Sequence, residues 1–283
     1  MNLRVVGVYR EPEFSPGKIA PDTAILDHVL ARLRHQGART EAMTAARFAA
    51  RPSDAADLVI AMCQGAPALS QLASMDEAGA ITINPALAIR NCYRDLLAAG
   101  LMRAGVPIPE GALLATSQPL DLKRLRALDL SAPAYVKRGD LHALGPDDVR
   151  RVQGLEQLEP AVTDFARRGI GLVYVQQEIT GKLVKFYGVC DEFFSAIPAD
   201  GLPLSDTVEL GLERAARTAA AALGLEIWGG DAIVNGNSCT IIDFNDWPSF
   251  EPVRATAATA IARRCWQLVR RHPLAAQLSD KAH

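Results

Sequence analysis

Short apolar runs alternate with amphipathic stretches over the first part of the chain. The amphipathic stretch Thr23–Gln36 predicts a helix, with Asp22 as its N-cap and Gly37 at its end. The apolar runs predict three buried strands, which are Leu3–Tyr9, Asp57–Met62 and Ala80–Ile83. Strands and helices in this order are typical of a parallel sheet. We therefore predict a small N-terminal α/β domain over residues 1–84.

The middle of the chain has a different pattern, in which one long helix precedes several short strands. The apolar spacing over Pro85–Ala104 predicts the helix, which ends at Gly105. The strands predicted after it are Ala112–Ala115, Ala134–Lys137 and Leu172–Glu178. This mixture of elements predicts a small α+β lobe over residues 85–180.

Two hairpins and two helices are predicted in the last part of the chain. The hairpins pair Val184–Val189 with Phe193–Ile197, and Ile227–Val234 with Cys239–Phe244. The helices cover Ser205–Leu223 and Val253–Arg271. Asn235-Gly-Asn is a strong turn signal inside the second hairpin. Residues 181–283 are predicted to form a third domain, and the whole chain is predicted to have an α/β fold with α+β lobes.

Composition limits the classes of function. The 283 residues carry a net charge of −2, so the basic excess of a general nucleic-acid binder is missing from the sequence. The apolar runs are too short to cross a bilayer, and the first is too short for a signal peptide. Five scattered cysteines without metal-binding spacing are typical of a reducing cytoplasm. We therefore expect a cytoplasmic protein with neither a nucleic acid nor a membrane as partner.

Two carboxylates and an amide fall close together in the last predicted hairpin. Strand alternation puts Asp243 and Asn245 on one face. Asp231 lies about as far from the turn on the partner strand, so it can stand opposite Asp243. Magnesium takes such oxygen ligands and keeps positions free for phosphate oxygens. A solvated hairpin with a polar end is the alternative.

A lysine and a flexible loop form the second candidate. Lys137 ends an apolar strand, where an unpaired charge is costly and a phosphate would pair it. The following loop, Arg138–Gly145, contains His142 and two glycines and could close over a triphosphate. The alternative is that Lys137 extends from the strand end into solvent.

The third candidate is the segment Val173–Gly181, which leads from one predicted strand to the next. Backbone N–H and C=O groups in such a linker can bind an adenine edge, and Lys185 would then point into the same cleft. An ordinary hairpin with one exposed lysine is the alternative.

Taken in order, these segments resemble the ATP-grasp superfamily over roughly residues 84–270, and residues 1–84 resemble its Rossmann-like pre-ATP-grasp domain. The resemblance implies ATP and Mg²⁺ as cofactors. It implies phosphate binding by Lys137, a nucleotide-facing Lys185, and Arg94 in the place of a phosphate-binding lysine, where it keeps the charge. The implied adenine hinge is Gln176, Gln177, Glu178 and Ile179, and the implied metal ligands are Asp231, Asp243 and Asn245.

Within the superfamily, the chain resembles the ribosomal-protein glutamate ligase and glutathione synthetase group. This resemblance implies an ADP-forming ligase, in which a small-molecule or peptide carboxylate takes the γ-phosphate and an amine (or thiol) displaces it. One departure is that Lys185 and Ile197-Pro198 stand where those ligases carry arginines. Arg10, Lys18 and Arg254 are candidates for binding anionic substrate groups. Many relatives are dimers or tetramers, so a homo-oligomer is also considered.

Two alternative functions stay open. Lys137-x4-His142 and Leu183-Val-Lys-Phe-Tyr-Gly are similar to the inositol polyphosphate kinases of the same fold. That resemblance implies a small-molecule kinase in which His142 contacts the substrate. The net charge and the six lysines argue modestly against a heavily phosphorylated substrate. A non-catalytic nucleotide-binding module is the third hypothesis.

Overall fold

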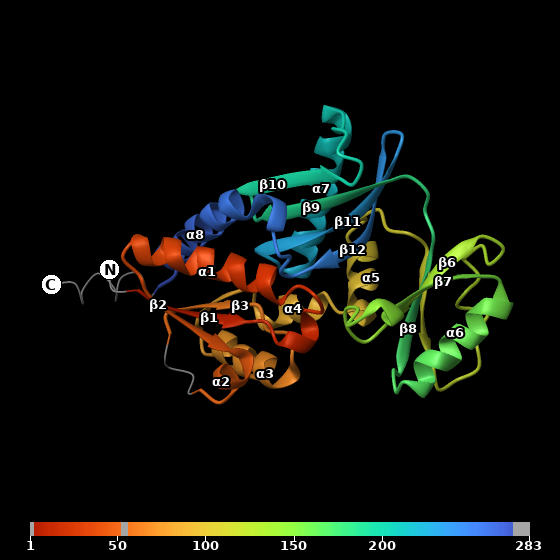
Figure 1. The fold of residues 1–283 in the computed structure, drawn as a ribbon, viewed down its shortest axis with the longest axis horizontal. Helices are drawn as coiled ribbons and strands as arrows, with labels where there is room; N and C mark the ends of the chain where they lie inside the picture. The colour runs from red at the N-terminus through yellow and green to blue at the C-terminus, as the bar shows by residue number, and fades with distance from the viewer. Residues whose placement is uncertain (1–2, 52–55, 274–283) are drawn as a thin grey trace.

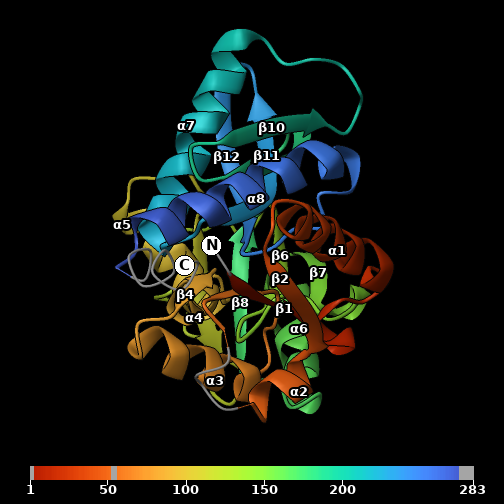
Figure 2. The same ribbon diagram turned by 90° about the vertical axis from the view of Figure 1, so that its left-hand side faces the viewer.

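A computed structural model describes residues 3–51 and 56–273. Three four-stranded sheets with helices packed on them follow one another along the chain (Figures 1 and 2). The ends of the first and third predicted domains, residues 1–2 and 274–283, lie outside the described residues, as do residues 52–55. No helix in the described part of the chain is long and apolar enough to cross a membrane.

The first sheet is parallel, with strand order β2-β1-β3-β4. Its strands are β1 (Arg4–Tyr9), β2 (Arg39–Thr44), β3 (Leu58–Ala61) and β4 (Ile81–Ile83). The central β1 and β3 are covered on both faces, which is why both read as continuous apolar runs. The strand β2 was not predicted, because only Met43 is buried in this polar edge strand.

Helices cover both faces of this sheet. They are α1 (Ile19–His35), α2 (Ala45–Ala49), α3 (Ala66–Glu77) and, from the far end of the chain, α8 (Arg254–Arg271). The predicted start of α1 was wrong: the helix begins at Ile19, so Asp22 lies in its first turn. Asp22 does not cap the helix, because its carboxylate accepts hydrogen bonds from Ser15 Oγ and Arg10 Nη1 instead.

The second sheet is antiparallel, with strand order β5-β8-β6-β7. It contains β5 (Gly111–Ala115), β6 (Pro133–Arg138), β7 (Val149–Gln153) and β8 (Leu172–Gln177), and α6 (Leu155–Arg167) packs on one face. The strand β7 was not predicted, because Val152 is its one buried residue.

The third sheet is also antiparallel, with strand order β10-β9-β11-β12. Its strands are β9 (Lys182–Val189), β10 (Phe193–Pro198), β11 (Ile227–Asn235) and β12 (Ser238–Asn245), so both predicted hairpins form. Helix α7 (Asp206–Leu223) packs on one face, and its N-cap Ser205 accepts a hydrogen bond from the Val208 N–H. Short 3₁₀ turns lie at Pro12–Phe14, Pro146–Asp148 and Glu251–Val253.

The helix predicted over Pro85–Ala104 is instead two helices, α4 (Ala86–Asn91) and α5 (Arg94–Arg103). Tyr93 has an extended backbone and becomes the N-cap of α5. Its hydroxyl donates a hydrogen bond to the Gln64 carbonyl, so tertiary contacts outweigh the local helical pattern here. The break places Arg94 at the first turn of α5, facing the centre of the molecule.

Helices α1 and α8 lie side by side (Figure 2), in a core shared by the first and third sheets. Asn84, which follows β4 and is fully buried, ties these sheets together. Its Nδ2 donates to the carbonyls of Ile227 (2.8 Å) and Asp246 (2.7 Å), and its Oδ1 accepts from the N–H groups of Glu226 and Ile227. Each predicted domain contains one of the three sheets, while α4, α5 and α8 pack across the predicted boundaries, so the division into three domains stays a prediction.

Candidate functional site

The hairpin β11–β12 brings two carboxylates together. Asp231 and Asp243 are directly paired in its register, and a β-bulge follows immediately after Asp231. Asp231 is also paired with Lys185 on β9, whose Nζ donates to Asp231 Oδ1 at 2.9 Å. Partial burial acts to lower the pKa of Lys185, but the hydrogen bond and charge of Asp231 outweigh it and raise the pKa. Asn245 ends β12 and lines the same cavity as both carboxylates.

Lys137 reaches from the second sheet to the third. Its side chain is 8% exposed, and its Nζ donates to the Ile242 carbonyl on β12 at 3.2 Å. Burial lowers the pKa of Lys137 to about 8, partly offset by the charge of Asp243 and reinforced by that of Arg94. The lysine therefore stays inside the protein, between the two sheets, rather than extending into solvent.

Arg94 joins this charged group from α5. It is buried, and its Nη2 lies 3.9 Å from Asp243 Oδ1. Its Nη1 donates to the carbonyls of Arg138 (3.0 Å) and Leu141 (3.4 Å), so the same side chain holds the glycine-containing loop. Burial acts to raise the pKa of Asp243, but the charges of Arg94 and Lys137 outweigh it, and the pKa is lowered. The carboxylate is consequently ionised at neutral pH.

Two cavities meet at Arg94 and Asp243. The smaller, about 30 Å³, is mainly apolar and is also lined by Lys137, Tyr174 and Gln176. The larger, about 270 Å³, is polar and lies between the first domain, the glycine-containing loop and the third sheet. The charged residues that line it are Arg10, Lys18, Asp22, Arg94, Lys185, Asp231 and Asp243. Arg254 is not among its lining residues.

The predicted adenine hinge is spread over several environments. Gln176 is buried, and its amide donates to the Ile242 carbonyl at 3.4 Å. The Gln177 side chain points to Asp129 and Pro133, and Glu178 forms an ion pair with Arg151 at 2.7 Å.

The main chain of this linker is also partly engaged. The N–H groups of Gln177 and Glu178 donate to the carbonyls of Glu110 and Pro133. The Ile179 N–H has no hydrogen bond to the described residues, so it is available to a base edge.

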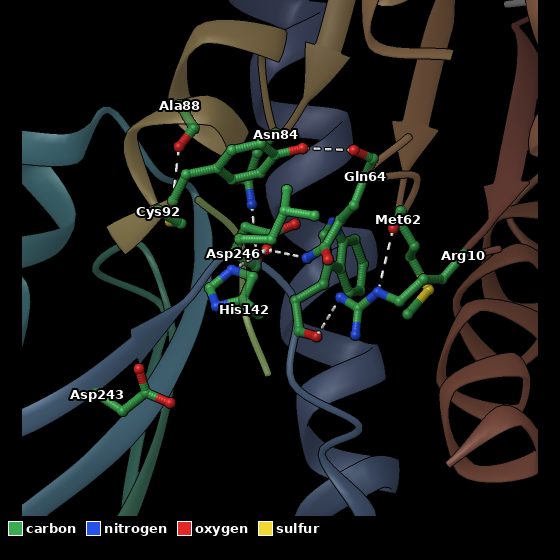
Figure 3. A network of polar contacts seen from close by, with 12 residues as sticks. Arg10, Met62, Gln64, Asn84, Ala88, Cys92, His142, Asp243 and Asp246 are labelled. Atoms are coloured by element: carbon green, nitrogen blue, oxygen red, sulfur yellow. Dashed lines mark hydrogen bonds and ion pairs between the residues drawn. The ribbon is translucent and has the colours of Figure 1, made fainter. Parts of the chain in front are cut away.

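His142 lies in the loop between β6 and β7 and is among the residues that line the larger cavity. Its ring packs edge-to-face against Tyr93, and its Nε2 lies 3.9 Å from Asp246 Oδ1 (Figure 3). Both ring nitrogens are buried without a hydrogen-bond partner in the described chain. Burial lowers the pKa of His142, so the ring is neutral at pH 7. A direct contact between these nitrogens and a substrate hydroxyl, as the kinase hypothesis requires, needs the loop to move.

The chain was compared with known protein families, curated proteins and solved structures. The chain matches no protein-family model and no curated protein. Among solved structures it is similar to the D-alanine–D-alanine ligase from Coxiella burnetii, with a TM-score of 0.75, 13% identity and 99% of both chains covered. The same ligase from Bacillus anthracis gives a TM-score of 0.72 at 13% identity, covering 98% of this chain and 99% of that one.

Two further structures extend the comparison. The Bacillus anthracis ligase complexed with ATP gives a TM-score of 0.71 at 15% identity over 98% of this chain and 99% of that one. A D-cycloserine synthetase gives a TM-score of 0.67 at 18% identity, covering 93% of this chain and 99% of that one. This chain has the ATP-grasp fold. The fold class predicted from the sequence is confirmed.

The oxygen donors that line the larger cavity suit a magnesium ion. Asp231 and Asp243 are paired across the hairpin, and Asn245 adds an amide oxygen at the same cavity. In the described residues no group of three or more His, Cys, Asp or Glu side chains is placed to hold a metal. The predicted site therefore depends on Asn245 as its third ligand. Lys185 pairs with Asp231 and Arg94 lies near Asp243. A bound metal ion would take the place of these cations or add to their charge.

Two residues at the centre of the site, Asp246 and Gln64, were not predicted. Asp246 is fully buried beside His142, and Gln64 donates to it from the segment that follows β3. Trp247 accepts a hydrogen bond from Arg10 on its carbonyl. Gln64 could have been suspected, because ligands of parallel sheets gather at the carboxyl ends of the strands. Asp246 directly follows the predicted ligand Asn245, but strand alternation gave no reason to examine it.

Proposed function

We propose that this protein is an ADP-forming, magnesium-dependent ligase that joins a carboxylate to an amine through an acyl phosphate. The observation that carries the proposal is the meeting of Lys137, Arg94 and the carboxylate pair where two cavities join. Four separate elements, α5, β6, β11 and β12, supply these two cations and two carboxylates. A triphosphate passing between the cavities would find cations on both sides and a place for a divalent ion.

The two cavities suggest how the substrates divide. The apolar cavity suits the adenine ring, and Gln176 in its lining could meet the edge of the base. At about 30 Å³ it holds little more than a water or two, so the second and third sheets have to separate for the nucleotide to enter. Lys137 now bridges those sheets through the Ile242 carbonyl, and a phosphate would take over its ammonium.

The polar cavity suits the acceptor carboxylate. In the proposed reaction its oxygen attacks the γ-phosphorus, the bond to the β-phosphate oxygen breaks, and ADP leaves. The amine then attacks the acyl carbon, and phosphate departs with the carboxylate oxygen. Lys137, Lys185 and Arg94 offset the negative charge that spreads over the transferring phosphoryl group. Asp231, Asp243 and Asn245 would hold Mg²⁺, which supplies further neutralisation at the phosphate oxygens.

The similar solved structures support this chemistry over phosphorylation of a hydroxyl. The proteins named in them are D-alanine–D-alanine ligases and a D-cycloserine synthetase, which couple small molecules. Small-molecule substrates are therefore proposed here as well, and their identity is left to experiment.

A hydroxylamine trap tests the proposal directly. Purified protein is incubated with ATP, Mg²⁺, pooled carboxylic acids and hydroxylamine, and both ADP and hydroxamate are measured. A ligase releases ADP and forms a hydroxamate with one acid of the pool, because hydroxylamine captures the acyl phosphate. A kinase releases ADP with a hydroxyl substrate and forms no hydroxamate, and a binding module releases no ADP. Either of these last results would refute the proposal.

A further inference from the structure

A buried carboxylate follows the predicted metal ligands at the end of β12. Asp246 is completely buried, and its Oδ1 accepts a hydrogen bond from Gln64 Nε2 at 2.8 Å. Its main-chain carbonyl accepts from Asn84 Nδ2 at 2.7 Å, so the backbone is fixed. Its Oδ2 has no hydrogen-bond partner within the described residues. An unpartnered oxygen of this kind is costly, and native proteins rarely keep one without a use.

The group that faces Asp246 is unpartnered too. His142 extends from the loop between β6 and β7 toward the carboxylate (Figure 3), and neither of its ring nitrogens has a partner in the described chain. The 3.9 Å between Nε2 and Asp246 Oδ1 is about 1 Å too long for a hydrogen bond. Tyr93 packs against the ring, and Arg94 holds the loop carbonyls, so the loop is already guided toward Asp246.

We propose that Asp246 is a positioning residue for the loop that covers the phosphates. When the loop settles over bound ATP, His142 closes the remaining gap and donates a hydrogen bond to the Asp246 carboxylate. This inference rests on the proposed nucleotide site. The contact gives a hydrogen bond to two buried atoms that now lack one, His142 Nε2 and Asp246 Oδ2. It also ties the loop to the strand that carries Asp243 and Asn245.

Because of where Asp246 lies, the proposed contact would fix the loop relative to the rest of the site. Asp246 is adjacent to Asn245 in sequence, and through Gln64 and Asn84 it is anchored to the first domain. We call the His142–Asp246 hydrogen bond the latch. A loop held by the latch is fixed in position relative to both the metal ligands and the polar cavity. Loss of the latch would leave nucleotide affinity from Lys137 and the adenine cavity, but the loop would no longer be held for transfer.

Hydrogen–deuterium exchange tests the latch without requiring turnover. The full chain is compared with and without Mg²⁺ and a non-hydrolysable ATP analogue, in which an imido group replaces the β–γ bridging oxygen. In the wild type, the analogue should slow exchange in residues 139–145 and in β8. In His142→Phe, which keeps a ring against Tyr93 but removes both nitrogens, the protection of β8 should persist while that of the loop is lost. His142→Gln keeps a donor and should restore part of it.

Activity provides a second readout. His142→Phe should lower kcat roughly 10-fold, with a smaller change in the KM for ATP. Adding His142→Phe to Asp246→Asn should cost little more than Asp246→Asn alone, because both changes remove one contact. His28→Asn, on the exposed side of α1, is the matched control and should behave as wild type.

The results that overturn the inference are distinct from those that overturn the proposed function. Protection of β8 with no protection of the wild-type loop, or undiminished loop protection in His142→Phe, overturns the latch alone. Fully additive losses in the double variant also overturn it. An analogue that protects no segment of the wild type overturns the nucleotide site, and the latch with it.

Discussion

Replacing Lys137 with methionine should stabilise the protein while removing nucleotide binding. Burial lowers the pKa of Lys137 from 10.5 to about 8. At about 1.4 kcal/mol per pKa unit, its charge costs the folded state roughly 3 kcal/mol at pH 7. Methionine removes that cost but also removes the hydrogen bond to the Ile242 carbonyl, worth about 1 kcal/mol. The expected net gain in the free energy of unfolding is therefore about 2 kcal/mol.

The gain should depend on pH in a defined direction. Because the folded-state pKa of Lys137 lies below its unfolded value, the cost is fully present below pH 8. Between pH 8 and 10.5 the folded protein has lost a proton that the unfolded chain still binds, so the cost fades as pH rises through this window. Above it the lysine is neutral in both states. There Lys137→Met should be no more stable than the wild type.

Urea unfolding followed by tryptophan fluorescence measures this difference, since Trp228 and Trp247 are fully buried. Wild type and Lys137→Met are compared at pH 7 and near pH 10.5, with Lys123→Met, an exposed lysine, as control. The same variants are tested for thermal stabilisation by ATP with Mg²⁺, which Lys137→Met should lose. A variant that is less stable than the wild type at pH 7, or a gain that persists at high pH, would refute the reasoning.

Three further predictions follow from single contacts. Asp243→Asn removes a carboxylate proposed to bind the metal, so Mg²⁺-dependent ADP release should fall at least 100-fold while the far-ultraviolet circular dichroism stays unchanged; retained turnover would contradict the proposed site. Asn84→Ala removes four buried hydrogen bonds and should lower the free energy of unfolding by about 3–5 kcal/mol in urea titrations. In Gly188→Ala the new methyl would overlap the buried Trp228 ring, so we expect a loss of more than about 2 kcal/mol by the same measurement, with Gly211→Ala, which has open space, as control.

The residues proposed to bind the nucleotide differ in how well local sequence indicated them. Lys137 and Asp243 each follow an apolar run, where a charge has to be compensated, and that anomaly is visible in the sequence. Arg94 was found only by resemblance. Its burial depends on the break at Tyr93, which is caused by contacts with Gln64 and is absent from the local helical pattern.

The local sequence pattern by itself determined the elements that contain clear apolar runs or a strong turn signal. The strands β1 and β3, both hairpins of the third sheet and the Asp231–Asp243 pairing followed from apolar runs and a turn whose spacing sets the register. The edge strand β2 has no such pattern, because Met43 is its one buried residue.

Only the tertiary structure decided which distant segments meet. The residue Asp246 faces His142 because Asn84 and Gln64, from the first domain, fix the end of β12. The partners are separated by about a hundred residues or more along the chain. No local periodicity records such a contact, since it depends on how three sheets and the helices shared between them pack, and that packing is a property of the whole chain.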